Sequence, residues 1–223
     1  MASQAAGSHV RWMEKRYLSG GGRYPQTSGF TCGAATLLNI AFDLGAAVEL
    51  SPEAEYAIWR QANSVWMGGG HPGIEPWALA LAGVRLGLGA VLHQTGMSQV
   101  FDGWNRNPEK REVASIVRKA DMAALAATGT EDRKFSFDGS GMRCLVRDGA
   151  RLAVLVGNSR DLHWVAVLGG SDGFAHVHDP YRAGSLDDLR NPWSEAPVTW
   201  ENLRRSMALN SKEAACMVEF RMP

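Results

Sequence analysis

Three residues of this chain have types and surroundings suited to nucleophilic catalysis. Cys32 follows a loop-like Gly/Ser segment and opens an apolar run with helical spacing, so unpaired backbone N–H groups and the helix dipole would favour its thiolate. His163 starts a β-rich run and Asp179 ends the next one, so a hairpin would bring both to the same end. A carboxylate there would orient the imidazole, and the imidazole would activate the thiol. The pattern predicts a Cys–His–Asp triad that forms a covalent acyl-enzyme.

A fourth residue, Gln26, lies six positions before Cys32. Its side-chain N–H is within reach of an oxyanion formed at the thiol, and the Cys32 backbone N–H is the second expected donor. Taken alone, each of the four has an ordinary explanation, such as a small core thiol or a turn-forming Asp before Pro. Their combination favours catalysis.

The segments that carry these residues resemble papain-like cysteine peptidases. Three segments carry the resemblance: Gln26–Ala35, His163–Gly169 and Asp179–Tyr181. In particular, they are similar to the peptidases that cleave bacteriocin leader peptides after a double glycine, and to stand-alone bacterial relatives. In that family a Gln polarises the oxyanion, the Cys opens the central helix, a His followed by an aromatic residue starts a strand, and an Asp-Pro pair completes the triad. The resemblance implies the same roles for the four residues named above.

The chain departs from the family pattern in two respects. Thr31 stands where the family commonly has an acidic residue, and Ala34 stands where it has Pro. The stretch between the Cys and His motifs is also longer than in the leader peptidases. We therefore expect an insertion at about residues 88–135, within the helical part of the chain.

Helical and β-rich patterns divide the chain into two halves. Helical spacing covers about 32–44, 52–63, 76–86 and 108–128, whereas β-rich runs cover 152–157, 162–169, 174–178 and 215–222, with a helix at about 200–209. This order predicts an α+β fold. With the resemblance, it becomes a single papain-like domain over 1–223, in which a helical lobe (about 1–140) carries the nucleophile helix and packs on an antiparallel β-sheet lobe (about 141–223).

The longest helical pattern, at about 108–128, carries apolar residues near one face, which is the face expected to pack inward. These are Val113, Ile116, Val117, Ala120, Ala124 and Leu125.

Composition and charge exclude several classes of function. Lys+Arg and Asp+Glu both number 23, so the formal net charge is zero and no nucleic-acid partner is expected. No stretch has the roughly 18 consecutive apolar residues of a membrane span, so no membrane partner is expected either. The odd number of cysteines, three, and the lack of a signal-peptide core indicate free thiols in the cytoplasm. Export by a dedicated secretion system would leave no such mark.

The predicted function is that of a cysteine hydrolase, a peptidase or amidase, acting on a peptide, a protein or a small amide without a cofactor. Substrate contacts are predicted for Gly70 and His71, in a Gly-rich loop, and for Trp164, beside the expected base. Three alternatives share the fold: an acyl or aminoacyl transferase, a bacterial effector protease, and an inactive peptide-binding pseudopeptidase. The substrate, the acyl acceptor and the oligomeric state are left open.

A metal site is the main rival interpretation. His176 and His178 would lie on one face of a regular strand, and Asp179 follows them. No further histidine has a matching local spacing, so the prediction is that no metal is bound.

Overall fold

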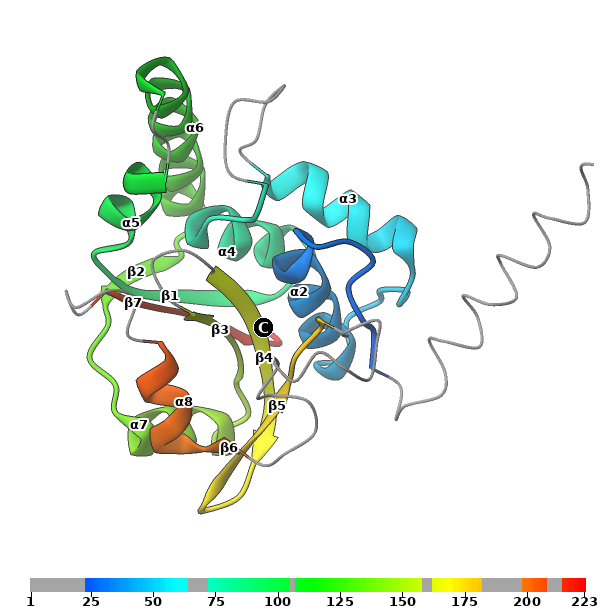
Figure 1. The fold of residues 1–223 in the computed structure, drawn as a ribbon. Helices are drawn as coiled ribbons and strands as arrows, with labels where there is room; N and C mark the ends of the chain where they lie inside the picture. Colours follow the sequence, from blue (N-terminus) through cyan, green and yellow to red (C-terminus); the bar gives the residue numbers. More distant parts are fainter. Residues whose placement is uncertain (1–22, 64–71, 105–106, 158–161, 182–197, 208–213) are drawn as a thin grey trace, which may run out of the picture.

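A single mixed sheet forms the centre of the molecule (Figure 1). The computed structural model describes residues 23–63, 72–104, 107–157, 162–181, 198–207 and 214–223. Within these residues the sheet has the strand order β2-β1-β7-β3-β4-β5-β6. Neighbouring strands pair antiparallel, except for β1 and β2, which are parallel. The strands are β1 (Gly89–Thr95), β2 (Glu131–Lys134), β3 (Arg151–Gly157), β4 (Leu162–Gly170), β5 (Phe174–His178), β6 (Val198–Thr199) and β7 (Ala215–Arg221).

Helices cover both faces of the sheet (Figure 1). One face carries the first three described helices and the other carries the last two, while α5 and α6 form an excursion between β1 and β2. The helices are α2 (Cys32–Asp43), α3 (Pro52–Ala62), α4 (Pro76–Arg85), α5 (Met97–Trp104), α6 (Pro108–Ala127), α7 (Gly139–Arg147) and α8 (Trp200–Ser206).

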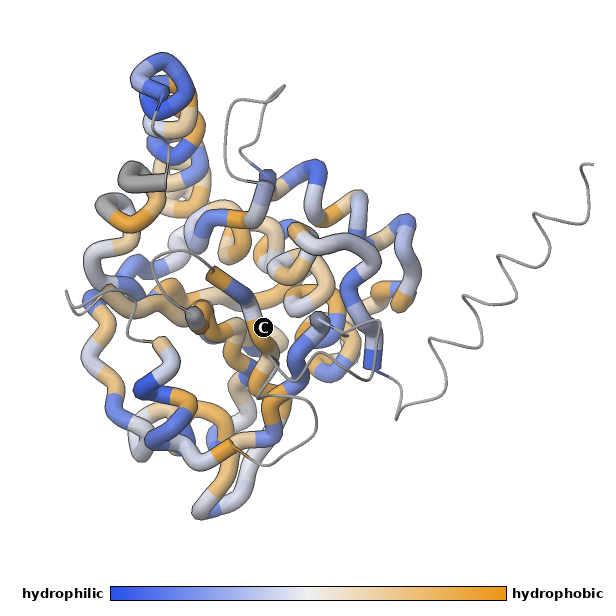
Figure 2. Tube along the Cα trace, in the orientation of Figure 1, coloured by the Kyte–Doolittle hydropathy of each residue, from blue (hydrophilic) through white to orange (hydrophobic). Residues whose placement is uncertain are grey.

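Alternate residues of the central strands feed two separate hydrophobic cores. On β3, Ala153 and Leu155 pack with α2, whereas Val154 and Val156 pack with α7 and α8. This is the period-two alternation of a strand, with both faces apolar because both are covered. Figure 2 shows these strands as the apolar centre of the molecule. The α+β fold, with its nucleophile helix on the sheet, is confirmed and is consistent with a papain-like arrangement.

Capping residues mark the first turns of α3 and α6. Ser51 accepts a hydrogen bond from the Ala54 backbone N–H, and Pro52 occupies the first position of α3. Asn107 caps α6 in the same way. Thr31 precedes α2 but makes no side-chain capping bond.

The expectation that the sheet begins after residue 140 is wrong. The stretch 88–135, expected as an insertion in the helical lobe, supplies both β1 and β2. β1 is half-buried and pairs with β7 along its whole length. Strand β2 has the sequence Glu-Asp-Arg-Lys and every residue is exposed, so no hydrophobic period marks it. It forms because β1 offers a free edge, and it makes that edge of the sheet charged.

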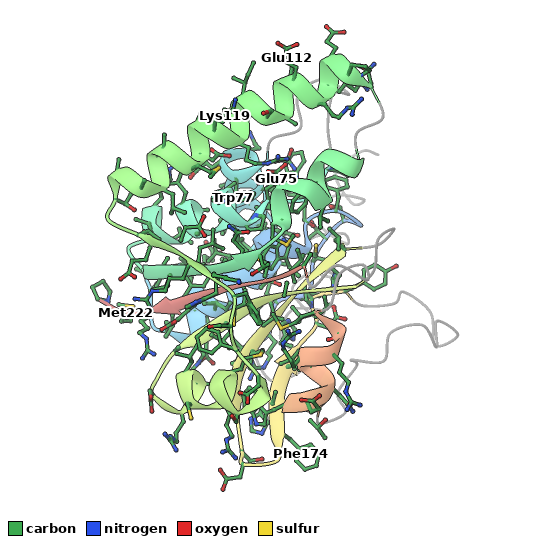
Figure 3. All side chains as sticks on the ribbon, turned by 90° about the vertical axis from the view of Figure 1, so that its left-hand side faces the viewer. Glu75, Trp77, Glu112, Lys119, Phe174 and Met222 are labelled. Atoms are coloured by element: carbon green, nitrogen blue, oxygen red, sulfur yellow. The ribbon has the colours of Figure 1, made fainter. Side chains whose placement is uncertain are left out.

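Helix α6 packs differently from the expectation. Its buried residues are Arg118 and Leu125, while Val113 and Ile116 are exposed. Arg118 donates from Nε (2.7 Å) and Nη2 (3.1 Å) to the buried Glu75 carboxylate, which precedes α4. Figure 3 shows Glu75 beneath α6 and Glu112 directed away from it. A buried ion pair therefore joins α6 to α4. Among the described helices, none combines the length and apolar character that a bilayer crossing needs.

Candidate active site

Cys32 is the first residue of α2, and its helix is fastened to the sheet next to the site. The residue is 7% exposed, and the helix packs on β4 and β3. One turn later, the Thr36 hydroxyl donates to the Trp164 carbonyl oxygen at 3.0 Å. The thiol therefore lies at the end of α2 that carries the positive helix dipole.

His163 and Asp179 meet at one end of the β4–β5 hairpin. The His163 Nε2 atom lies 2.6 Å from Asp179 Oδ1, and the Asp179 side chain is only 4% exposed. The same carboxylate oxygen accepts the Tyr181 backbone N–H at 2.8 Å. Asp179 therefore both forms the turn and holds one ring nitrogen of the imidazole.

The His163 imidazole also hydrogen-bonds the Cys32 side chain. Since Asp179 engages Nε2, Nδ1 is the ring nitrogen left for the thiol. Burial lowers the pKa of His163, but hydrogen bonds to Asp179 and Cys32, with the negative charge of both groups, outweigh burial and raise this pKa to about 10. The site therefore favours a protonated His163 imidazole at neutral pH.

Gln26 lies in a loop that is tied to the Asp179–Pro180 segment. Its backbone N–H donates to the Pro180 carbonyl oxygen at 2.8 Å, and its Nε2 donates to the Ser28 carbonyl oxygen at 2.6 Å. The second Nε2 hydrogen can serve an oxyanion. Its Oε1 atom is buried and has no hydrogen-bond partner among the described residues; a buried acceptor without a donor costs about 1–3 kcal/mol.

A buried carboxylate from α3 holds this loop. Glu55 is fully buried, and it accepts the Tyr24 hydroxyl (2.7 Å), the Thr27 hydroxyl (2.7 Å) and the Thr27 backbone N–H (3.0 Å). Sequence reasoning missed Glu55. Its spacing to Ile58 and Ala62, the two other buried residues of α3, is three and seven. That period places it on the buried face and was the available signal.

Two further side chains hold the Tyr24 backbone. Asn39 of α2 accepts its N–H at 2.8 Å and donates to its carbonyl oxygen at 2.7 Å. The His178 Nε2 atom lies 3.1 Å from the same carbonyl oxygen. In the proposed metal set, His178 is thus engaged with the loop and His176 is exposed. The described residues contain no cluster of three or more His, Cys, Asp or Glu arranged to hold a metal ion.

A small cavity of about 70 Å³ opens beside Cys32. Trp164 forms part of its wall, where the indole N–H donates to the Ile74 carbonyl oxygen at 2.9 Å. The cavity is lined by Gly29, Phe30, Cys32, Pro72, Gly73, Ile74, Phe101, Leu155, Leu162 and Trp164.

Comparison with protein families gives a match over nearly all of the described chain. A family model described as Peptidase_C39 like family matches residues 23–220. The chain belongs to this family. Comparison with curated proteins gave no match, and neither did comparison with solved structures. The predicted relationship to C39-like cysteine peptidases is confirmed, whereas the likeness to leader-processing peptidases in particular stays a prediction.

The region matched by the Peptidase_C39 like family includes every predicted site residue. The structure brings Cys32, His163 and Asp179 into one hydrogen-bonded set and ties the Gln26 loop to it. Their catalytic roles stay predictions. Trp164 lines the cavity, and its predicted contact with substrate also stays a prediction. The other two predicted substrate contacts, at positions 70 and 71, lie outside the described residues.

Proposed function

We propose that this protein is a cysteine peptidase or amidase that cleaves its substrate through a covalent acyl-enzyme. One observation carries the proposal: the His163 imidazole hydrogen-bonds both Cys32 and Asp179, and these bonds raise its pKa to about 10. A structural histidine has no need of a thiol at a helix start as its second partner. Membership of the Peptidase_C39 like family supports the same conclusion.

In the first half of the proposed reaction, the Cys32 sulfur attacks the carbonyl carbon of the scissile amide and forms an S–C bond. The oxyanion accepts the Cys32 backbone N–H and the free Nε2 hydrogen of Gln26. As the C–N bond breaks, the His163 imidazolium gives its proton to the leaving nitrogen. A thioester and a free amine result.

In the second half, the neutral His163 accepts a proton from a water molecule that attacks the thioester. The S–C bond breaks, the carboxylic acid leaves, and the thiolate–imidazolium pair is restored. Asp179 keeps Nε2 engaged throughout, so Nδ1 faces the sulfur in both halves. An amine in place of water would give acyl transfer by the same steps.

Thiol alkylation tests this proposal directly. The rate of modification by iodoacetamide would be followed from pH 5 to pH 9, with mass spectrometry to assign the modified cysteine. Cys32 should react selectively well below pH 8, and His163→Ala should remove that selectivity. Cys216 is the internal control, because burial raises the pKa of its thiol. If Cys32 reacts no faster than Cys144, the proposal is wrong.

A further inference from the structure

The described residues that line the cavity beside Cys32 include no charged side chain. Trp164, Ile74, Leu155 and Phe101 are each at most 5% exposed, and the indole N–H of Trp164 is already bonded to a backbone carbonyl. The Cys32 thiol is thus the reactive polar group of its lining. A space of this kind excludes charged groups, because they would lose their water without gaining a partner.

The cavity wall is also tightly assembled. A Cβ atom on Gly33 would lie 3.0 Å from Trp164 Cδ1 and 3.2 Å from Ile74 Cβ, so the glycine allows α2 to approach both side chains. Phe101 comes from α5, in the stretch 88–135 that sequence comparison expected as an insertion. The shape of the cavity therefore depends on a part of the chain that departs from the family pattern.

We propose that this cavity is a substrate subsite that takes a small branched aliphatic side chain next to the scissile carbonyl; this rests on the proposed function. A dry apolar cavity of about 150 Å³ holds a benzene ring. A cavity of about 70 Å³ suits three or four carbons instead. Its position against the Cys32 sulfur sets it within a few bonds of the acyl carbon.

Acylation by three p-nitrophenyl esters tests the subsite. The esters are the acetate, the isovalerate and the phenylacetate, and release of p-nitrophenolate gives the acylation rate of Cys32. Each buried methylene contributes about fourfold, so the isovalerate should exceed the acetate by tenfold or more. The phenylacetate should fall below the isovalerate, because its ring does not fit.

Variants at the cavity wall give opposite expected shifts. Phe101→Trp should bring the isovalerate-to-acetate ratio toward one, while Phe101→Ala should favour the phenylacetate. Phe174→Trp is the matched control, since Phe174 is exposed on β5, and it should leave the ratios unchanged. The subsite would be overturned if the acetate and isovalerate esters acylate Cys32 at equal rates, or if neither Phe101 variant changes the ratios of the rates. Either result would leave the proposed function intact. A lack of acylation by every ester would overturn both.

A different observation assigns a positioning role to Glu55. Its carboxylate receives three hydrogen bonds from Tyr24 and Thr27, which flank the Gln26 loop, so its hydrogen bonds in the described part of the chain go to this loop and not to Cys32 or His163. Burial of a carboxylate among neutral donors costs free energy of folding. A role in positioning the Gln26 loop would account for that cost. We infer that Glu55 sets the position of the Gln26 amide for the oxyanion, which likewise rests on the proposed function.

Comparison of acylation with alkylation separates positioning from general stability. Acylation forms an oxyanion, whereas displacement of iodide by the Cys32 sulfur does not. Glu55→Gln should slow acylation by the isovalerate ester by about tenfold to a hundredfold, less than full loss of an oxyanion donor. The rate of alkylation by iodoacetamide should not change. The exposed Glu53→Gln, on the same helix, is the matched control.

A double-mutant cycle gives the decisive outcome. If Glu55 acts through Gln26, the Glu55→Gln effect should disappear in a Gln26→Ala background. Thr27→Val removes one hydroxyl donor and provides a milder variant in case Glu55→Gln does not fold. The inference is overturned if acylation and alkylation fall equally, or if the two substitutions are additive. If iodoacetamide does not react selectively with Cys32 in the protein without substitutions, the proposed function is contradicted instead.

Discussion

The sheet contains two imidazole–carboxylate pairs with different surroundings. His163 and Asp179 lie 2.6 Å apart at the end of β4 and β5, and His93 and Glu219 lie 3.1 Å apart on β1 and β7. Both carboxylates are nearly buried, at 4% and 9% side-chain exposure. The His163 side chain is 24% exposed, whereas that of His93 is 2% exposed. The two pairs share their chemistry and differ in access.

The third partner of each pair makes the larger difference. His163 has a thiol on its other side, whereas His93 has the ring of Phe137 packed edge-on at 4.9 Å. Glu219 also accepts from Arg221 at 2.7 Å; the hydrogen bond from His93 and the nearby guanidinium lower the pKa of Glu219 despite burial. A buried His–carboxylate pair thus serves as a structural contact between strands. It can take part in catalysis only where a nucleophile lies beside it and substrate can reach it.

Removal of the nucleophile should have the largest effect on this comparison. Cys32→Ala leaves His163 with Asp179 alone, so the pair proposed to be catalytic becomes a second structural pair. We expect turnover to fall by about 10⁴-fold or more, while the melting temperature changes little, because one small side chain at a cavity edge is lost. Ester turnover and thermal unfolding measure the two effects. Retention of full activity would contradict the mechanism.

Substitution of the carboxylate should have the next largest effect. Asp179→Asn removes the negative charge that helps to raise the pKa of His163 to about 10, and it replaces the carboxylate acceptor with a neutral amide. Turnover should fall by about 10²- to 10⁴-fold, as when a triad carboxylate is lost. Because a lower pKa means that the imidazolium loses its proton earlier, the alkaline limb of the pH–rate profile should move from near pH 10 toward the usual histidine value. An unmoved limb would mean that Asp179 does not act on His163.

Disruption of the second pair should change stability and not turnover. His93→Leu removes the partner of one Glu219 oxygen in a buried setting, so the free energy of unfolding should fall by about 1–3 kcal/mol. Turnover should stay within about threefold of the unmodified protein, since a structural tie makes no transition-state contact. Urea unfolding and ester hydrolysis separate the two. A loss of turnover as large as that of Asp179→Asn would show that the pairs are coupled.

The smallest effect is expected at an exposed histidine on β5. His176→Ala should change the free energy of unfolding by no more than about 0.5 kcal/mol, as at most surface positions. Turnover and its pH dependence should be unaltered. A clear loss of activity on its removal, or a rise in melting temperature on addition of zinc to the unmodified protein, would revive the metal interpretation.

The same contrast explains what the sequence could predict. The hairpin that joins His163 to Asp179 was predictable, because an apolar run, a Gly-rich turn and a second run are local signals. The pair His93–Glu219 joins residues 126 positions apart, and no local pattern marks such a contact. Strand β2, without an apolar residue, was hidden for a related reason: only its pairing with β1 makes it a strand.

Buried polar residues account for most of the remaining errors. Helix α6 was expected to bury Val113 and Ile116. Arg118 is buried instead, because it forms an ion pair with the buried Glu75 carboxylate. Periodicity ranks residues by hydropathy, so it cannot identify a charged side chain whose partner lies in another helix. Glu55 was missed because it is charged, although its spacing to Ile58 and Ala62 placed it on the buried face of α3.

The position of β7 has a consequence for how the molecule is made. This strand is synthesised after the other six, yet it lies between β1 and β3 and pairs with both. Until β7 pairs with its neighbours, the β1–β2 pair and the β3–β4 pair are not joined, and each has an unpaired strand edge. Contacts between segments far apart in the sequence form slowly. When the ribosome has already added Cys32, His163 and Asp179, the growing chain therefore still lacks β7, the strand that joins β1 to β3. The sheet that supports these three residues is therefore complete only after its last strand has been synthesised.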